Sequence, residues 1–250
     1  ATTTADLDGR ALTALLRYEL PSNFSVYGGV RASHVEGNAF VNFIGPGYNL
    51  DVNGGTEYGY VLGAAYEMPE IALRVALTYN SQIVHTFTGT DGLTGGVAAT
   101  NFQTTIPESW MLEAQSGIAE DTLLFGSIRY VDWSDFQICP TNFPGGGCLV
   151  SLSNDTVTYT AGLGRRFTDN WSGAVTVLRE PQVGGNASNL NPTDGRTALG
   201  LAVTWENEQF EVTGGLQYSW LDDTGPLAAT TGVFTDNNAV SAGLRVGIRF

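Results

Sequence analysis

Apolar and polar residues alternate with a period of two along most of this 250-residue chain. In residues 209–221 the even positions from Phe210 to Trp220 are apolar or glycine, and the odd positions from Glu211 to Ser219 are polar or glycine. Successive side chains of a β-strand point to opposite faces, so this alternation predicts strands with one apolar face. Helical periodicity is hard to find, and the 32 glycines also disfavour helices. The sequence therefore predicts an all-β fold.

The alternating segments are about ten residues long, which is the length that a tilted strand needs to cross a lipid bilayer. No run of about 18 apolar residues occurs, so a membrane-spanning helix is excluded. About eleven strands are expected, at residues 12–20, 24–33, 58–68, 71–83, 110–118, 122–133, 156–167, 171–180, 195–205, 209–221 and 239–250.

The connectors between these strands alternate between short and long. Short connectors are expected at residues 21–23, 69–70, 119–121, 168–170 and 207–208. Long connectors are expected at about residues 36–55, 87–108, 134–155, 181–194 and 222–238. Outer-membrane barrels have short periplasmic turns and long outer loops, whereas a water-soluble sandwich or propeller has no reason to keep its long loops on one side. The pattern therefore predicts an antiparallel transmembrane β-barrel of the bacterial outer membrane.

The two faces of each strand are assigned to lipid and lumen by their polarity. In a membrane barrel the apolar face contacts outer-membrane lipid and the polar face lines the lumen. Several aromatic residues, among them Trp110, Trp171 and Trp205, fall toward strand ends, as an aromatic girdle at the membrane interfaces requires. The alternative is a soluble barrel with an apolar interior, which would place Arg17 and Arg31 outside.

The net charge of −14 argues against nucleic acid as a partner, because nucleic-acid affinity depends on neutralising phosphates. Cys139 and Cys148 lie close together among prolines and glycines, and no histidine is near them. This arrangement favours a loop disulfide in an oxidising compartment over a metal site. No metal and no cofactor are expected.

Four stretches of the sequence carry a resemblance to a known family. They are residues 71–83 (IALRVALTYNSQI), 104–110 (TTIPESW), 128–136 (IRYVDWSDF) and 164–171 (GRRFTDNW). In order and spacing they resemble the C-terminal half of the FadL family of outer-membrane transporters for long-chain fatty acids and other hydrophobic compounds. The resemblance implies a monomeric barrel of fourteen strands, plugged by an N-terminal hatch, that takes a hydrophobic ligand from outside and releases it sideways into the membrane.

The chain departs from that family in its N-terminal part. The hatch with its Asn-Pro-Ala segment and the early strand with an inward kink have no counterpart here. The first and last expected strands also run the same way, so antiparallel closure needs an odd number of further strands, unless the strand count is off by one. Three further strands would bring the count to fourteen. We therefore expect residues 1–250 to form a single β-barrel domain that lacks an upstream hatch and the first strands.

No motif in the sequence supports catalysis. His34 and His85 lie where strands give way to long loops, and no nucleophile motif accompanies them. We interpret both as surface or rim histidines and expect no enzyme.

Inward-facing arginines are the candidates for contacting a polar ligand group. Charge ladders across a barrel interior are usually structural, but a planar guanidinium also binds a carboxylate well. Arg31 and Arg129 are expected in the outer half of the wall and Arg196 at an outer strand end. These three are the candidates for holding a ligand carboxylate.

An apolar path through the lumen is expected beside these arginines. Its candidate residues in the wall are Tyr27, Val61, Met111, Phe125 and Leu178, and those in the outer loops are Phe40, Phe43 and Phe102. The expected function is passive uptake of long-chain fatty acids or other hydrophobic compounds, captured by the outer loops and passed through the lumen toward a lateral opening. The alternatives are a general porin for small hydrophilic solutes, which needs a wide wet lumen, and a structural or adhesive barrel whose acidic loops bind a partner or divalent ions.

Overall fold

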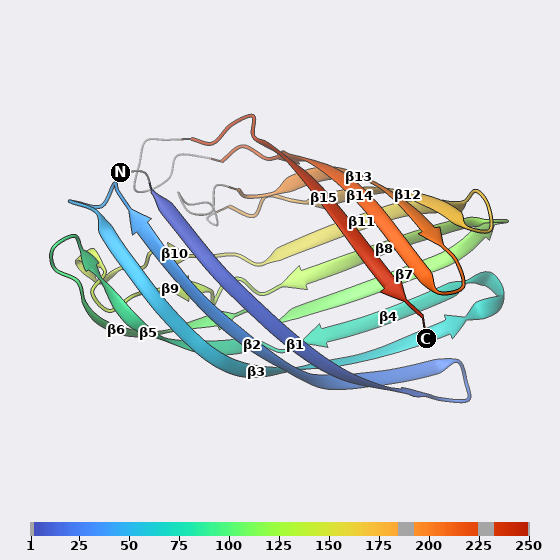
Figure 1. The fold of residues 1–250 in the computed structure, drawn as a ribbon, viewed down its shortest axis with the longest axis horizontal. Helices are drawn as coiled ribbons and strands as arrows, with labels where there is room; N and C mark the ends of the chain where they lie inside the picture. The colour runs from blue at the N-terminus through green and yellow to red at the C-terminus, as the bar shows by residue number, and fades with distance from the viewer. Residues whose placement is uncertain (1–2, 185–192, 225–232, 250) are drawn as a thin grey trace.

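A curved antiparallel sheet makes up most of the molecule (Figure 1). The computed structural model describes residues 3–184, 193–224 and 233–249. Within them, eleven strands follow one path of neighbours: β1 (Thr4–Glu19), β2 (Phe24–Val41), β3 (Tyr48–Met68), β4 (Leu73–Asn80), β7 (Ser109–Ala119), β8 (Thr122–Val131), β11 (Thr156–Arg166), β12 (Trp171–Glu180), β13 (Arg196–Glu206), β14 (Phe210–Leu221) and β15 (Asn238–Ile248). The all-β prediction is confirmed, and each of the eleven expected strands has a counterpart on this path. Phe250, the last residue of the expected final strand, lies outside the described residues.

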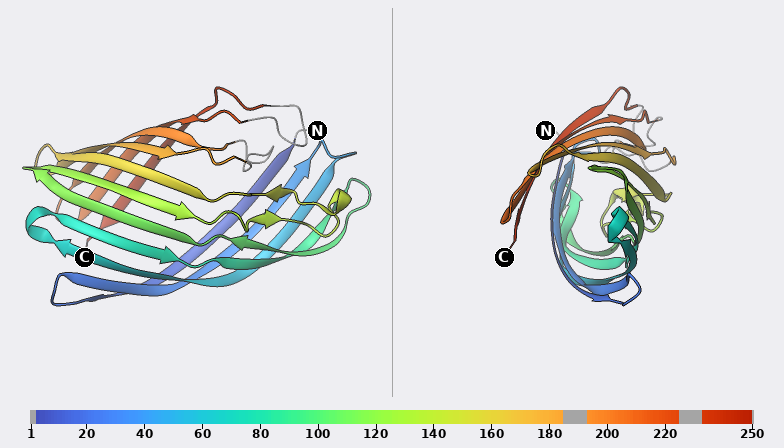
Figure 2. Two further views of the ribbon diagram at one scale, coloured as in Figure 1. Left: turned by 180° about the vertical axis from the view of Figure 1, so that it is seen from behind. Right: turned by 90° about the vertical axis from the view of Figure 1, so that its right-hand side faces the viewer.

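The sheet curls around a lumen, with β1 and β15 at its two edges (Figure 2). We call the end that carries the short connectors the turn end and the opposite end the loop end. Both edge strands run from the loop end to the turn end, because neighbouring strands alternate in direction along the path. The fourteen strands implied by the resemblance and the single-domain boundary stay predictions. The described residues contain no helix that is long and apolar enough to cross a membrane.

Two of the expected long loops are extensions of the sheet. Residues 36–55 belong mostly to β2 and β3, and residues 87–108 mostly to a hairpin of β5 (Ile83–Leu93) and β6 (Ala98–Ile106), which pairs with β3. The expectation of loops there was wrong. These extensions bury their alternate residues in a small core of their own, made of Val41, Tyr48, Leu50, Val52, Phe87 and Phe102.

The strand expected at residues 71–83 is divided in two. A short 3-10 helix occupies Pro69–Ile71, β4 ends at Asn80, and β5 begins at Ile83. The chain is interrupted at the same level on the opposite side, where β6 ends at Ile106 and β7 begins at Ser109. Pro107 lies in this gap and has no backbone N–H to donate to a ladder. β3 continues past both breaks and pairs first with β5 and then with β4.

Glycines in the wall make room for aromatic rings that lie against the neighbouring strand. A Cβ atom added to Gly63 would collide with the ring of Tyr27, and one added to Gly162 would collide with the ring of Phe125. Both rings belong to lumen-facing positions. Part of the high glycine content is therefore explained by bulky interior rings, each of which needs a glycine at the position it covers on the neighbouring strand.

The outward face of the sheet is apolar, and no described part of the chain covers it. Leu16 is 84% exposed and Leu201 is 57% exposed. Charged pairs lie on the inward face, where Glu67 accepts from Arg17 Nη2 at 2.7 Å and from Arg74 Nε at 3.1 Å. The lipid-facing assignment is confirmed, and the alternative of a soluble barrel with an apolar interior was wrong.

Aromatic rings form contacts near both ends of the apolar band. Tyr60, Tyr79 and Trp110 contact one another at the level where β4 ends, with ring centroids 5.9 and 4.7 Å apart. At the turn end, the ring centroids of Phe24 and Tyr66 are 4.9 Å apart. Tyrosine and tryptophan prefer such interfacial positions, so the β5–β6 hairpin and the extensions of β2 and β3 project beyond the membrane.

Candidate functional site

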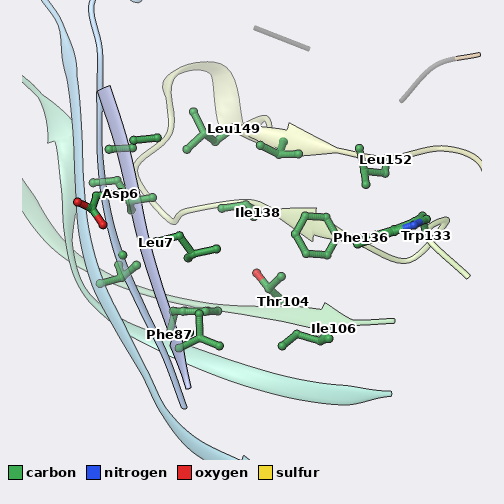
Figure 3. A pocket seen from close by; sticks show the side chains of 18 of the residues that line it. Asp6, Leu7, Phe87, Thr104, Ile106, Trp133, Phe136, Ile138, Leu149 and Leu152 are labelled. Atoms are coloured by element: carbon green, nitrogen blue, oxygen red, sulfur yellow. The ribbon is translucent and has the colours of Figure 1, made fainter. Parts of the chain in front are cut away.

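A cavity of about 580 Å³ lies inside the loop end of the barrel (Figure 3). Its wall combines residues from β1, β2, β3, β5 and β6 with the connector between β8 and β11. The apolar side chains that line it include Leu7, Val35, Leu50, Val52, Phe87, Phe102, Ile106, Phe136, Ile138, Leu149 and Leu152. Leu7 is 74% exposed and yet points into this space, so the cavity is open to solvent on that side. We call it the loop-end cavity.

Two stacked phenylalanines close one side of the loop-end cavity. Phe87 of β5 and Phe102 of β6 are register partners, and their rings are nearly parallel with centroids 5.4 Å apart. Both side chains are buried against the core of the strand extensions. This side of the cavity is therefore preformed by side chains of a packed core, as apolar ligand sites usually are.

A folded connector covers the cavity from the other side. This cap, residues 133–152, contains the two-residue strands β9 (Gln137–Ile138) and β10 (Val150–Ser151), which pair with each other. Cys139 and Cys148 are bonded to each other within it, so the predicted disulfide is confirmed. Figure 2 places the cap at the same end of the molecule as the β5–β6 hairpin.

A buried carboxylate fastens the cap to β5. Asp91 has no exposed surface, and it accepts hydrogen bonds from Tyr48 Oη at 2.6 Å, from the Asn142 backbone N–H at 3.1 Å and from Asn142 Nδ2 at 2.8 Å. The ring of Phe143 packs edge-on against Tyr48, with centroids 5.0 Å apart. Three donors for one carboxylate compensate for its loss of water.

A second carboxylate holds the base of the cap. Asp155 accepts from Tyr130 Oη at 2.6 Å and from the Ser134 backbone N–H at 3.2 Å. The hydrogen bond from Tyr130 lowers the pKa of Asp155 below its ordinary value, and the Ser134 N–H adds to this effect against the opposing effect of burial. The ionised carboxylate thus joins the beginning of the cap to the start of β11.

A second cavity, of about 390 Å³, lies nearer the turn end. We call it the turn-end cavity. It follows the loop-end cavity along the same strands, because β2 contributes Val35 and Ala39 to the first cavity and Tyr27 and Arg31 to the second. Its lining is mixed, with Thr13, Leu15, Arg17, Ser25, Tyr27, Arg31, Val61, Arg74, Thr78 and Asn80.

The arginines of the turn-end cavity differ in their partners. Arg17 and Arg74 share the carboxylate of Glu67. Arg31 donates from Nε to Thr13 Oγ1 at 3.0 Å, and within the described residues no carboxylate lies within 4.0 Å of its guanidinium. Arg31 is therefore the arginine of this cavity whose guanidinium is not paired with a carboxylate and can bind an anionic group of a ligand.

The structure brings together three of the predicted site residues and separates the others. Tyr27, Val61 and Arg31 line the turn-end cavity, and Phe102 lines the loop-end cavity. The other lumen-facing candidates, Arg129, Met111, Phe125, Leu178 and Arg196, line neither cavity. Arg129 is exposed to the lumen beside Met111, its register partner, and Arg196 Nη2 lies 4.0 Å from Glu180 Oε2.

Phe40 and Phe43 also lie outside both cavities. Ala39 faces the loop-end cavity, so its neighbour Phe40 projects from the opposite face of β2, where its ring lies close to Gly47. Phe43 lies beyond the end of β2 and is 43% exposed. Their part in a ligand path stays a prediction without support from either cavity.

Leu50 and Val52 line the loop-end cavity but are not among the predicted site residues. Tyr48, Leu50 and Val52 alternate with Asn49, Asp51 and Asn53, which is the pattern of a half-buried strand and predicts the β3 extension. His85 was wrongly assigned to the rim, because it has no exposed surface. Its burial follows from the β5–β6 hairpin, which the expected loop concealed.

Comparison with known proteins supports the same architecture. No protein-family model matches the sequence, and a search of curated proteins finds no match. A FadL homologue from Pseudomonas aeruginosa superposes with a TM-score of 0.75, covering 97% of this chain and 66% of that one at 16% identity. The toluene transporter TbuX from Ralstonia pickettii gives a TM-score of 0.61, covering 86% of this chain and 63% of that one at 12% identity. The toluene transporter TodX from Pseudomonas putida gives 0.59, with 86% and 64% covered at 11% identity.

This chain thus spans slightly less than two thirds of the length of these three proteins. At such low identity the likeness concerns the fold. The chain therefore has the transmembrane β-barrel fold of the FadL homologue and the toluene transporters.

Proposed function

We propose that this chain is the barrel of a FadL-type channel for passive uptake of hydrophobic compounds across the bacterial outer membrane. The observation that carries the proposal is the loop-end cavity, a preformed apolar space of about 580 Å³. It lies on the loop-end side of the Tyr79–Trp110 ring contact that marks the membrane interface. Its volume lies in the range of about 300–1,000 Å³ that is usual for small-molecule sites. The structural likeness to a FadL homologue and to toluene transporters supports the same assignment.

In this proposal the ligand is captured at the loop end and then moves toward the turn-end cavity. The two cavities follow each other along β1 and β2, so a ligand passes between them without leaving the lumen. We propose a monomer as the working unit, as the resemblance implies. Capture in an apolar cavity needs no energy source, because the hydrophobic effect moves the compound out of water.

Long-chain fatty acids fit the proposal through Arg31. Its guanidinium faces the turn-end cavity with a threonine hydroxyl as partner and offers planar donors to a carboxylate, while Val61 and Leu15 offer apolar contacts nearby. The cluster of Arg17, Glu67 and Arg74 lies farther toward the turn end. A charged cluster is a poor path for an acyl chain, so we propose that the ligand leaves sideways through the wall into lipid.

Native mass spectrometry of the detergent-purified full-length protein tests the proposal. We expect a hydrophobic compound to copurify in a one-to-one ratio and added long-chain fatty acid to displace it. Conductance across a planar bilayer is the second readout. An empty barrel that passes small ions freely would contradict the proposal and favour a general porin.

A further inference from the structure

Two buried polar side chains lie next to each other on the β5–β6 hairpin, and one of them, Thr104, lines the loop-end cavity. His85 of β5 and Thr104 of β6 are directly opposite in the hairpin register. His85 has no exposed surface and Thr104 is 6% exposed. Within the described part of the chain, His85 Nε2 and Thr104 Oγ1 have no hydrogen-bond partner.

The pair is surrounded by apolar side chains. Along the same face of the hairpin, Phe87 and Phe102 stack on one side, and Ile83 and Ile106 are the register pair on the other. Thr104 lines the cavity, and its side chain projects from β6 toward the cap in Figure 3. Opposed residues of an antiparallel pair have Cβ atoms about 5 Å apart, so His85 lies directly beside the Thr104 side chain that lines the cavity.

The unpaired atoms require an explanation. Most buried side-chain polar atoms in folded proteins have a partner, because a donor or acceptor that has lost water without a replacement destabilises the fold. The wall of an apolar cavity is the place where a ligand supplies that replacement.

The histidine contact indicates which chemical group fits. Nδ1 of His85 lies 3.3 Å from the carbonyl oxygen of Gly54, which only accepts, so Nδ1 carries a hydrogen, and in the tautomer that this contact selects Nε2 is an acceptor. The Thr104 hydroxyl both donates and accepts. A ligand hydroxyl can donate to His85 Nε2 and accept from Thr104 Oγ1, whereas a hydrocarbon satisfies neither atom and a carboxylate has no hydrogen for Nε2.

The charges around the cavity agree with a neutral group. Among the described residues that line it, Asp6, Glu180 and Asp194 are acidic and none is basic. An anionic head group would therefore enter without a cation to pair with.

We propose that His85 and Thr104 form a hydroxyl-binding site, through which the loop-end cavity selects hydrophobic alcohols or phenols over hydrocarbons of the same shape. This inference rests on the proposed function, and it names the substrate class of the first cavity. Arg31 in the turn-end cavity remains the proposed partner of anionic groups.

Binding of a matched pair of probes to the purified full-length protein tests this site. Isothermal titration calorimetry compares 4-ethylphenol with ethylbenzene. Wild-type protein should prefer the phenol by roughly tenfold, which is the effect of two neutral hydrogen bonds. Thr104→Val keeps the shape of the side chain and removes the hydroxyl, so the ratio of phenol affinity to ethylbenzene affinity should fall to about twofold.

Thr88→Val is the matched control, because Thr88 lies on the same hairpin with its side chain exposed on the other face. His85→Leu is a second variant and should also lose the preference. A preference that survives in Thr104→Val, or equal binding of both probes to wild type, would overturn the hydroxyl site while leaving hydrophobic uptake intact. Failure of wild type to bind either probe would overturn the proposed function together with the site.

Discussion

Removal of the Asp91 carboxylate should release the cap from the β5–β6 hairpin. Asp91 is completely buried and holds Tyr48 and Asn142 through three hydrogen bonds of 2.6 to 3.1 Å. Each hydrogen bond to a charged group contributes about 1.5–3 kcal/mol, but three that share one carboxylate are not additive. We therefore expect Asp91→Ala to reduce the free energy of cap opening by about 3–5 kcal/mol.

Hydrogen exchange measured by mass spectrometry reports this opening directly. Peptides that cover residues 137–150 should lose roughly two to three and a half orders of magnitude of protection in Asp91→Ala, because each 1.4 kcal/mol changes the opening constant about tenfold. Because Ile138, Leu149 and Leu152 belong to the cavity wall, affinity for hydrophobic ligands should fall in the same variant. Amides of the transmembrane strands should keep their protection.

Asp51→Ala is the matched control, since Asp51 is an exposed aspartate on the neighbouring strand β3. Asp91→Asn should give an intermediate loss, because the amide keeps one acceptor oxygen. Unchanged exchange of the cap in Asp91→Ala, with the barrel still folded, would refute the reasoning. Such a result would mean that the Cys139–Cys148 disulfide and apolar packing hold the cap without the carboxylate.

Three further predictions concern the ligand, the wall and pH. Arg31→Ala should weaken long-chain fatty acid binding by roughly tenfold to a hundredfold and leave hydrocarbon binding unchanged in calorimetry; equal loss of both would exclude the carboxylate role. Gly162→Val should lower the thermal unfolding temperature, read from heat-dependent gel mobility, because the added valine side chain would collide with the Phe125 ring. An unchanged unfolding temperature would mean that the ring moves aside. The pKa of Asp155 is lowered in the folded protein, so its ionised carboxylate stabilises the base of the cap at any pH above the ordinary carboxylate pKa. Protection of the cap against hydrogen exchange should therefore be lost as the pH falls below about 4. Asp155→Asn should remove that pH dependence.

The transmembrane part of the fold follows directly from the order of residues. Lipid requires an apolar outward face, and a strand places every second residue there, so the pattern of β14 identifies both the strand and its orientation. The β5–β6 hairpin does not contact lipid, and its side chains pack against β3 and the cap instead. Its pattern therefore lacks the contrast of the other strands, and residues 87–108 resembled a loop.

The candidate site depended on contacts between distant segments. The arginines at positions 17, 31 and 74 look equivalent in the sequence, but the strand register gives Glu67 to Arg17 and Arg74 and leaves Arg31 with Thr13. The same holds for His85, whose burial comes from pairing with β6 and from close contact with Gly54.

A period of two and alternating connector lengths were thus enough to establish a transmembrane β-barrel, because both are local consequences of strand geometry and of lipid as the solvent. The two cavities, the anchoring of the cap by Asp91 and the free charge of Arg31 arise from which strands become neighbours and in which register. Local sequence contains little record of such pairings, since each one joins residues that are tens of positions apart in the chain.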